Sequence, residues 1–391
     1  MNRVCSIFSQ ILQLFRRVEF ERAVREHQAE RHARGFTCWG QFVAMLFCPL
    51  GRAHSLREIC YGLAACEGKL KHLGVPQAPR RSTLAYANEH RPWQLYQTVF
   101  GHLLEKCRSL AGPQKKFRFK NKLVSLDATV IELCASLYDW AKFRRTKGAV
   151  KLHLLLDHEG YLPAFAVITE GRQHEIRVAR RLRWEPGTMV AMDRGYTDYE
   201  WFVELSRQEV YFVTRLKDNA RYEVVERRPV PENRNIRQDE ILFFYSQTGE
   251  GREYFFRRVE VWDEEKQEAI VLLTNHLEFG ATTIAAIYKD RWQIELFFKA
   301  LKQLCKIKTF VGTSANALKT QIWTALIAML LLRWLQLRAR YGWSLSNLAA
   351  LLRQQLFVYR DLYAWLDDPF EPPPALAGLH DGQLLLGLEA E

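Results

Sequence analysis

Apolar residues recur at helical spacing through roughly the first 115 residues of the chain. The segments 35–50, 55–66 and 82–91 have the lengths and boundaries of three helices, and turns containing proline or glycine separate them. Short helices joined by turns resemble the helix-turn-helix class of DNA-binding domains, although many helical bundles share this pattern. Residues 1–115 are therefore predicted to form an all-α DNA-binding domain.

Beyond residue 122 the pattern changes to apolar strands that alternate with helices. The segment 123–131 is an apolar run containing one acid, Asp127, and the segment 149–168 is typical of two strands joined by a turn. After a helix, a short strand ends at Asp193, and a second helix and another strand follow it. This order predicts a mixed α/β sheet, and residues 116–345 are assigned to one α/β domain.

Residues 218–278 have a different pattern, in which charged and aromatic residues alternate and no helical segment occurs. Four strand-like segments of this kind follow one another. They predict an antiparallel β unit inserted into the α/β domain. An alternative is that they supply two more strands of the main sheet, together with loops.

The sequence YKDRWQIELFFKALKQ, late in the α/β domain, predicts an amphipathic helix with an unusual polar side. At 3.6 residues per turn, four polar residues share a narrow stripe at about 0°, 300°, 340° and 320° around the axis: Tyr288, Arg291, Glu295 and Lys302. A separate arc carries the apolar residues that are expected to face the core: Ile287, Ile294, Phe297, Leu301 and Leu304. Asp290 also projects toward that arc.

Positive charge is concentrated at the start of the chain. Residues 1–120 contain 20 Lys and Arg against 8 Asp and Glu, whereas the remaining residues contain 36 of each, so the first part carries the whole net charge of +12. A basic helical domain on a neutral body suits a nucleic-acid partner, although the charge could also serve only solubility. Arg80 and Arg81, directly before the third predicted helix, are candidate DNA contacts.

Other features of the sequence bear on where the protein acts. The 8 cysteines include no C-x2-C pair of a structural zinc site, and no signal peptide is recognisable. The longest uncharged apolar run, Thr320–Leu332, is too short to cross a membrane. We therefore expect a cytoplasmic, nucleoid-associated protein with no membrane partner. Residues 346–391 are interpreted as an acidic, partly helical tail.

Three carboxylates are distinguished by their positions. Asp127 lies within an apolar strand, Asp193 ends another strand, and Glu295 lies on the polar stripe of the late helix. Sites in open α/β sheets form at strand ends and beside neighbouring helices, so we expect the three to converge. Converging carboxylates repel one another unless cations bind between them. Two Mg²⁺ ions, for which Mn²⁺ is expected to substitute, suit this set and would cut phosphodiesters.

The polar stripe matches a known signature. Tyr288, Arg291, Glu295 and Lys302 meet the pattern Y-x2-R-x3-E-x6-K of the bacterial insertion-sequence-four family of DDE transposases, which this chain resembles. SLDATVI and AMDRGYTDYEWF, around the two aspartates, look like that family's acidic blocks. ERHARGFTCWGQFVAMLF and HSLREICYGLAA are similar to the N-terminal domain of one of its subgroups.

The resemblance implies an RNase H-like catalytic core whose metal-binding triad is Asp127, Asp193 and Glu295. It also implies contacts to transposon-end DNA near the scissile phosphate from the rest of the stripe: Tyr288, Arg291 and Lys302. Related members flip a base onto a tryptophan of the β insertion. Trp262 is the only tryptophan between residues 218 and 278, so it is the candidate for this role, with ordinary packing as the alternative.

The sequence as a whole predicts a DNA transposase. It is expected to bind double-stranded DNA at the terminal inverted repeats, to hydrolyse a strand at each end, and to transfer the ends into target DNA. Because two ends require two active sites, we expect a homodimer assembled on DNA. Two alternatives are an RNase H-like nuclease without strand transfer and a DNA-binding regulator derived from a transposase.

Overall fold

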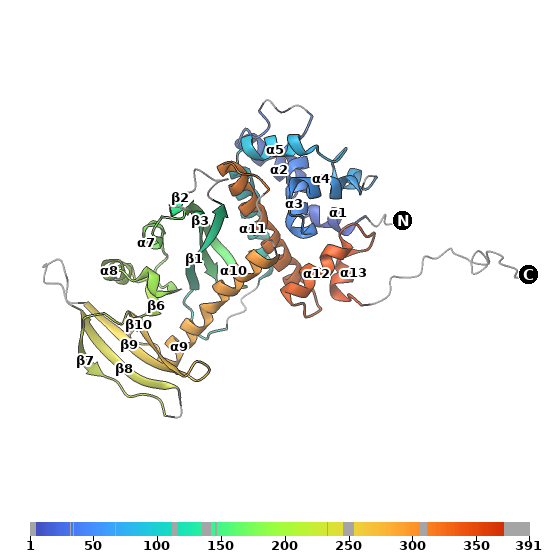
Figure 1. Ribbon diagram of the computed structural model, residues 1–391. Coiled ribbons are helices and arrows are strands. Elements are labelled where there is room, and N and C mark those ends of the chain that lie inside the picture. The colour runs from blue at the N-terminus through green and yellow to red at the C-terminus, as the bar shows by residue number, and fades with distance from the viewer. Residues whose placement is uncertain are drawn as a thin grey trace, which may run out of the picture.

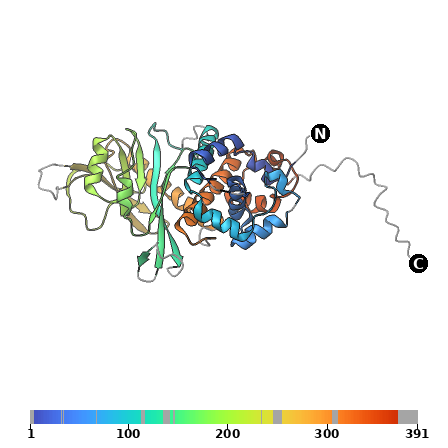
Figure 2. The same ribbon diagram turned by 90° about the horizontal axis from the view of Figure 1, so that it is seen from above.

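The computed structural model describes residues 5–31, 33, 35–66, 68–111, 116–134, 142–144, 147–232, 234–244, 254–304 and 311–370. Figure 1 shows a twisted β-sheet with helices packed on it, beside a cluster of helices from the early (blue) and late (red) parts of the chain. The view from above in Figure 2 shows the same division into a sheet part and a helical part.

The mixed α/β core is built from five strands: β1 (Leu123–Cys134), β3 (Lys147–Asp157), β4 (Leu162–Glu170), β5 (Met189–Met192) and β6 (Tyr211–Arg215). β1 pairs antiparallel with β3 and parallel with β5, while β4 pairs antiparallel with β3 and β6 runs parallel to β5. A short strand, β2 (Lys142–Arg144), also pairs with β3. The strands predicted at 123–131 and 149–168 are β1 and the β3–β4 hairpin, which confirms the predicted mixed α/β sheet.

Helices cover both faces of this core: α7 (Glu175–Ala179), α8 (Tyr199–Arg207) and α9 (Ala281–Asp290). Side chains of β5 point alternately to the two faces of the sheet and pack into different apolar clusters. Val190 and Met192 belong to the apolar cluster that contains residues of α8, whereas Met189 and Ala191 belong to the cluster that contains residues of α9. All four side chains are fully buried. A parallel strand covered on both faces has a continuous apolar sequence, as this segment does.

The inserted region forms four strands: β7 (Glu223–Arg227), β8 (Ile236–Phe244), β9 (Tyr254–Asp263) and β10 (Glu268–Thr274). Each pairs antiparallel with the next, and β10 pairs antiparallel with β6, with Leu273 opposite Thr214. The predicted antiparallel insertion is therefore confirmed. It continues the main sheet instead of standing apart, so the alternative reading also describes part of the structure.

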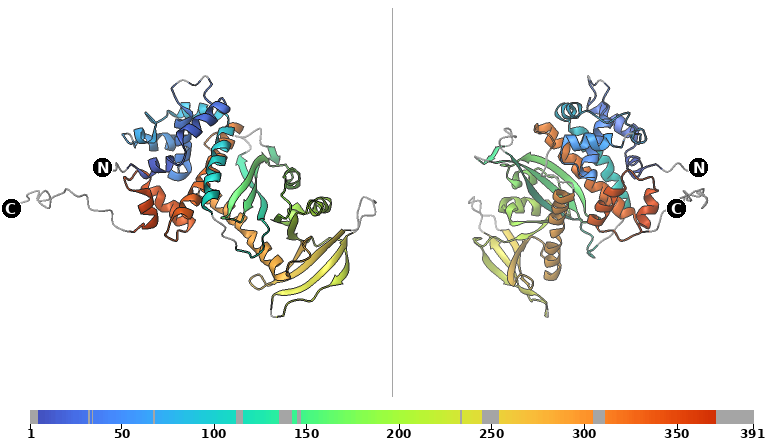
Figure 3. Two further views of the ribbon diagram at one scale, coloured as in Figure 1. Left: turned by 180° about the vertical axis from the view of Figure 1, so that it is seen from behind. Right: turned by 45° about the vertical axis from the view of Figure 1, so that its right-hand side comes forward.

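The N-terminal part contains six α-helices among the residues described: α1 (Ile7–Leu12), α2 (Arg17–Glu26), α3 (Cys38–Gly51), α4 (Leu56–Ala64), α5 (Arg81–His90) and α6 (Gln94–Leu110). A short 3₁₀ turn, η1 (Leu70–Leu73), lies between α4 and α5. The predicted helices are α3, α4 and α5. Figure 3 shows α6 lying between the sheet and the other N-terminal helices, where it contacts β4.

The late part of the chain returns to these helices through α11 (Ala315–Arg338), α12 (Leu345–Gln355) and α13 (Leu362–Asp367). α11 is the one helix in the described ranges that is long and apolar enough to cross a membrane. Most of it is buried in the protein, where it packs against α3, α5 and α6. It is the central helix of a protein core.

The two ends of the described chain are tied together. The backbone N–H of Ile7 donates to the carbonyl oxygen of Val358 at 3.0 Å, and that of Phe8 donates to Leu356 at 2.8 Å. One apolar cluster joins residues of α1, α3, α6 and β3 to residues of α11, α12 and α13. The boundaries predicted at 115 and 345 stay predictions, but this core crosses both. Residues 371–391 of the predicted tail lie outside the part described.

The helix predicted over 288–303 is two helices, so that prediction is wrong in one respect. α9 ends at Asp290 and α10 (Trp292–Leu304) begins after Arg291. The N–H of Arg291 donates to both Ile287 and Tyr288, and the N–H of Ile294 donates to Arg291, so the turn is tighter than an α-helix here. No glycine or proline lies at the break between α9 and α10, and the helical spacing of apolar residues continues across it. The sequence pattern therefore predicts one helix.

Candidate active site

A cavity of about 1130 Å³ contains the three predicted carboxylates among its lining residues: Asp127, Asp193 and Glu295. The strand register explains why the two aspartates meet. β1 and β5 are parallel neighbours with Leu126 opposite Met192, so Asp127 and Asp193 follow directly from paired residues. Glu295 comes from the first turn of α10, which packs against β1. The predicted convergence of the three carboxylates on one cavity is present in the structure.

Burial and neighbouring negative charges act on the aspartates. Burial, followed by the charge of Asp193, raises the pKa of Asp127 to about 7. Burial also raises the pKa of Asp193, although a hydrogen bond from the N–H of Gly195 at 2.9 Å to its Oδ1 opposes this. The surroundings of both carboxyl groups therefore oppose their ionisation. A bound cation would stabilise their ionised forms.

Arg291 supplies positive charge beside the carboxylates. Its Nη2 lies 2.5 Å from Oε1 of Glu295, and only 9% of the residue is exposed. Its charge also favours ionisation of Asp127 and Asp193. The turn between α9 and α10 therefore places a guanidinium against the third carboxylate, and not along a straight helical stripe.

Carboxylate oxygens are donors that suit a hard divalent cation such as Mg²⁺. Within the described segments, no three His, Cys, Asp or Glu side chains lie close enough together to form a complete metal site. The Glu295 carboxylate is paired with Arg291 instead. A cation held by all three residues would compete with Arg291 for this carboxylate.

The cavity also contains residues that the sequence analysis did not single out. Lys299 and the predicted Lys302 line it from α10, Arg52 comes from the N-terminal helices, and Arg353 comes from α12. No motif marks Arg52 or Arg353, since they reach the cavity only because the two ends of the chain pack together.

The other predicted DNA contacts lie outside the cavity lining. Tyr288 is in α9, with the Arg291 guanidinium 5.3 Å from its ring centre. Trp262 is in β9, and the guanidinium of Arg237 lies over its ring at 3.6 Å. Arg80 and Arg81 are exposed at the start of α5. Their roles in DNA binding stay predictions.

Asp290, which interrupts the apolar arc of the predicted helix, is the centre of a buried polar network. Its Oδ1 accepts from Nζ of Lys116 at 2.5 Å, and its Oδ2 pairs with Nδ1 of His158 at 2.5 Å. Nε2 of His158 lies 2.7 Å from Oγ of Ser125 in β1, and the Tyr161 hydroxyl donates to Asp290 at 3.3 Å. The network joins the end of α9 to β1, the strand that carries Asp127.

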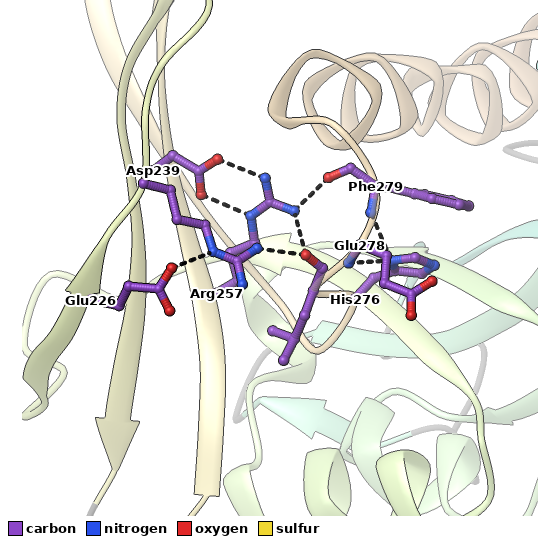
Figure 4. Close-up of polar contacts among 8 residues, drawn as sticks. Glu226, Asp239, Arg257, His276, Glu278 and Phe279 are labelled. Carbon is purple, nitrogen blue, oxygen red and sulfur yellow. Dashed lines mark hydrogen bonds and ion pairs between the residues drawn. The ribbon is translucent and has the colours of Figure 1, made fainter.

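A second network fixes the start of α9 (Figure 4). Buried Arg257 of β9 makes a two-pronged contact with Asp239 of β8, at 2.7 and 2.6 Å. Its Nη1 donates to the carbonyl oxygens of Leu277 and Phe279, in the segment that leads into α9. The β insertion is thus connected through one guanidinium to the helix preceding Arg291 and Glu295.

This chain is similar to known proteins over most of its length. A model described as a transposase DDE domain matches residues 118–331, and a domain of unknown function matches residues 4–76. The transposase y4zB of Sinorhizobium fredii is 30% identical over 78% of this chain and 84% of its own length. The transposase of insertion sequence element IS5377 of Geobacillus stearothermophilus is 29% identical over 65% of this chain and 67% of its own.

The piggyBac transposase, in a synaptic complex with hairpin DNA, aligns with 96% of this chain and 84% of its own, at 11% identity and a TM-score of 0.44. The family match spans the α/β core, the β insertion and α10, and includes the three carboxylates. It confirms the resemblance found in the sequence. The chain belongs to the DDE transposases, enzymes that cut and join DNA in a metal-dependent reaction.

Proposed function

We propose that this transposase uses Mg²⁺ to hydrolyse the DNA at each end of its element, and then joins the freed ends to target DNA in cut-and-paste transposition. One observation carries the proposal. Asp127 and Asp193 follow paired residues of neighbouring parallel strands, and both line one cavity with Glu295.

The three carboxylates would hold two Mg²⁺ ions, and Mn²⁺ is expected to substitute. When bound, the ions supply charge that activates the attacking oxygen and stabilises the leaving oxygen. Asp127 and Asp193 would present their oxygens without reorganisation, because the strands pair and each carboxylate accepts a backbone hydrogen bond. Arg291, released from Glu295, would then face the phosphate oxygens as a buried guanidinium.

The proposed reaction has two steps, hydrolysis and strand transfer, at one site. In the first, a water oxygen bonds to the scissile phosphorus, the bond from phosphorus to the 3′-oxygen breaks, and that oxygen takes a proton. In the second, the same 3′-oxygen loses its proton, bonds to a phosphorus of the target strand and displaces the 3′-oxygen there. In both steps an oxygen nucleophile attacks a phosphorus, first water and then the 3′-hydroxyl, so one set of carboxylates would serve both.

The partner we propose is double-stranded DNA, both the terminal repeats of the element and the target. Lys302 lines the cavity and would contact phosphates there, whereas Tyr288, outside the lining, would contact the DNA beside it. Trp262 is proposed to stack on a flipped base, and Arg80 and Arg81 to contact the end DNA. A homodimer acting on the nucleoid in the cytoplasm would supply the two active sites that two ends require.

Cleavage of DNA that carries the element's own ends tests the proposal. Wild-type protein with Mg²⁺ is expected to nick the boundary, and Glu295→Gln should lose at least a thousandfold in cleavage rate while binding the same DNA with unchanged affinity. The glutamine keeps the shape of the side chain but removes the charge that holds a cation. Arg291→Ala should weaken both cleavage and binding.

The possible results separate the alternatives. Cleavage without joining to a target would indicate a nuclease that lacks strand transfer. Binding of the element's ends without cleavage in the presence of Mg²⁺ or Mn²⁺ would favour a DNA-binding regulator derived from a transposase. Loss of end binding in Glu295→Gln would contradict the role given to Glu295.

A further inference from the structure

The cavity that holds the catalytic carboxylates is completed by parts of the chain outside the matched DDE domain, which covers residues 118–331. Arg52 follows α3 and lies within the region matched by a domain of unknown function. Three residues of α12 also line the cavity: Ser346, Ala350 and Arg353. Their spacing of four and three residues places them on one face of that helix.

The elements that contribute these residues are in mutual contact. α12 packs against α3, the helix that ends next to Arg52, and also against α10, the helix that carries Glu295. Arg52 and Arg353 therefore come from neighbouring elements that close the cavity beside the catalytic helix. Their position is set by the shared core of the two ends of the chain.

The cavity lining contains more cationic than anionic side chains. It contains three carboxylates, from Asp127, Asp193 and Glu295, and five cationic side chains: Arg52, Arg291, Lys299, Lys302 and Arg353. Arg291 is already paired with Glu295. With metal ions bound to the carboxylates the surplus of positive charge would increase. A cavity of about 1130 Å³ with such a surplus suits an extended polyanion better than a single small ligand.

The backbone at Arg52 supports a use for its side chain. Arg52 ends α3 in the left-handed conformation, with φ of 61°, and its N–H caps the carbonyl oxygen of Cys48. Glycine is the residue that usually occupies this position at a helix end, because it has no side chain to strain. Arg52 has an exposed side chain at this position instead. A non-glycine residue in the left-handed conformation strains the backbone, and such strain is often found at functional sites.

We propose that Arg52 and Arg353 form a second phosphate subsite, which holds the backbone of the reacting DNA strand beside the scissile phosphate. The proposal rests on the function proposed above, since it assigns further contacts to the same substrate. It gives the domain of unknown function and α12 a direct part in the active site. Base sequence is not read at this subsite, because guanidinium groups bind the phosphates that every sequence shares.

The test uses full-length protein with Arg52→Gly, Arg52→Lys and Arg353→Ala. Arg52→Gly removes the side chain but suits the left-handed backbone, so folding should be unimpaired. We expect cleavage of end DNA to fall at least tenfold in Arg52→Gly and Arg353→Ala, and to recover partly in Arg52→Lys. Arg207→Ala removes an exposed charge at the end of α8 and should leave cleavage unchanged.

A second measurement is independent of catalysis. In the Glu295→Gln background, the slope of log Kd against log salt concentration should decrease by about 0.7–0.9 for each arginine removed, because each contact releases counterions from one phosphate. If Arg52→Gly cuts the ends at the wild-type rate with an unchanged salt slope, the subsite does not exist. If wild type binds but never cuts, the proposed function fails, while the salt slopes still decide on the subsite.

Discussion

At the scale of single residues, the active site concentrates negative charge where burial opposes it. Sequence reasoning found the three carboxylates because each occupies a position that packing alone does not explain. The contact between Arg291 and Glu295 could not be predicted, since it depends on the break between α9 and α10. No helix-breaking residue marks that break in the sequence. Sequence reasoning also could not find Arg52 and Arg353, whose positions depend on contacts between distant segments.

Asp127 carries a prediction about stability without metal ions. Its pKa is raised to about 7 in the folded protein, chiefly by burial, against about 3.9 in an unfolded chain. The neutral form is therefore favoured by folding. Its contribution to stability is complete below pH 4 and is lost as the pH rises through 7.

In EDTA, Asp127→Asn should consequently be more stable than wild type at pH 8, by about 1 kcal/mol or more, and equal to it near pH 4. Thermal unfolding followed by circular dichroism at both pH values measures this. Asp218→Asn, at a side chain that is 98% exposed, is the control and should change nothing. Equal unfolding temperatures of wild type and Asp127→Asn at pH 8 would show that the ionised Asp127 carboxylate does not destabilise the fold.

At the scale of elements, the α9–α10 pair has to be held at two points to bring Glu295 to the strands. The Asp239–Arg257 pair fixes the segment before α9, and the network of Asp290 fixes its last turn against β1 and the β3–β4 hairpin. The sequence pattern predicted the strands and helices themselves. It placed Asp290 on the apolar side without an explanation, because its partners Lys116 and His158 come from other elements.

Asp290→Asn is expected to lower the free energy of unfolding by about 2 kcal/mol at pH 7, because it leaves a buried histidine and a lysine without their charged partner. Burial raises the pKa of Asp290, but hydrogen bonds from His158 and Lys116 outweigh this and lower it overall. The stabilisation is thus present above the unfolded pKa of about 3.9 and is lost as the pH falls below it.

The difference between Asp290→Asn and wild type should therefore shrink below pH 4, which denaturant titrations at pH 7 and pH 3.5 can measure. The variant should also lose more in cleavage rate than in DNA affinity, since the network positions the catalytic helix. Lys289→Ala, at the exposed neighbour on the same helix, is the matched control. A variant with full cleavage activity would show that the network serves stability alone.

At the scale of the whole molecule, the charge pattern and the sequence pattern suggested three consecutive parts, whereas the apolar core unites the first part with the last. α11 is the centre of that core, and its buried, almost uniformly apolar surface explains why its sequence resembles a membrane helix in composition. Patterns along the chain predict which faces are buried. They do not predict which distant element buries them.

The interpretation of the residues after 345 as a tail can be tested against this shared core. Trp365 of α13 is 2% exposed, and the same helix is tied to α1, where the Gln10 side chain accepts from the N–H of Leu362 at 2.9 Å. Trp365→Ala should lower the free energy of unfolding by about 3–5 kcal/mol, because the cavity it leaves lies within the core. Phe370→Ala, at a side chain that is 70% exposed, should change it by less than about 0.5 kcal/mol.

Unfolding of Trp365→Ala, followed by tryptophan fluorescence and by circular dichroism, should show one transition at a lower temperature in both signals. A single shifted transition means that the late helices stabilise the helical part and the α/β core together, so that the cavity wall carrying Arg353 is a permanent feature of the fold. An unshifted main transition would mean that α13 unfolds by itself, and the late helices would then be a tail in the energetic sense even though they pack like a core.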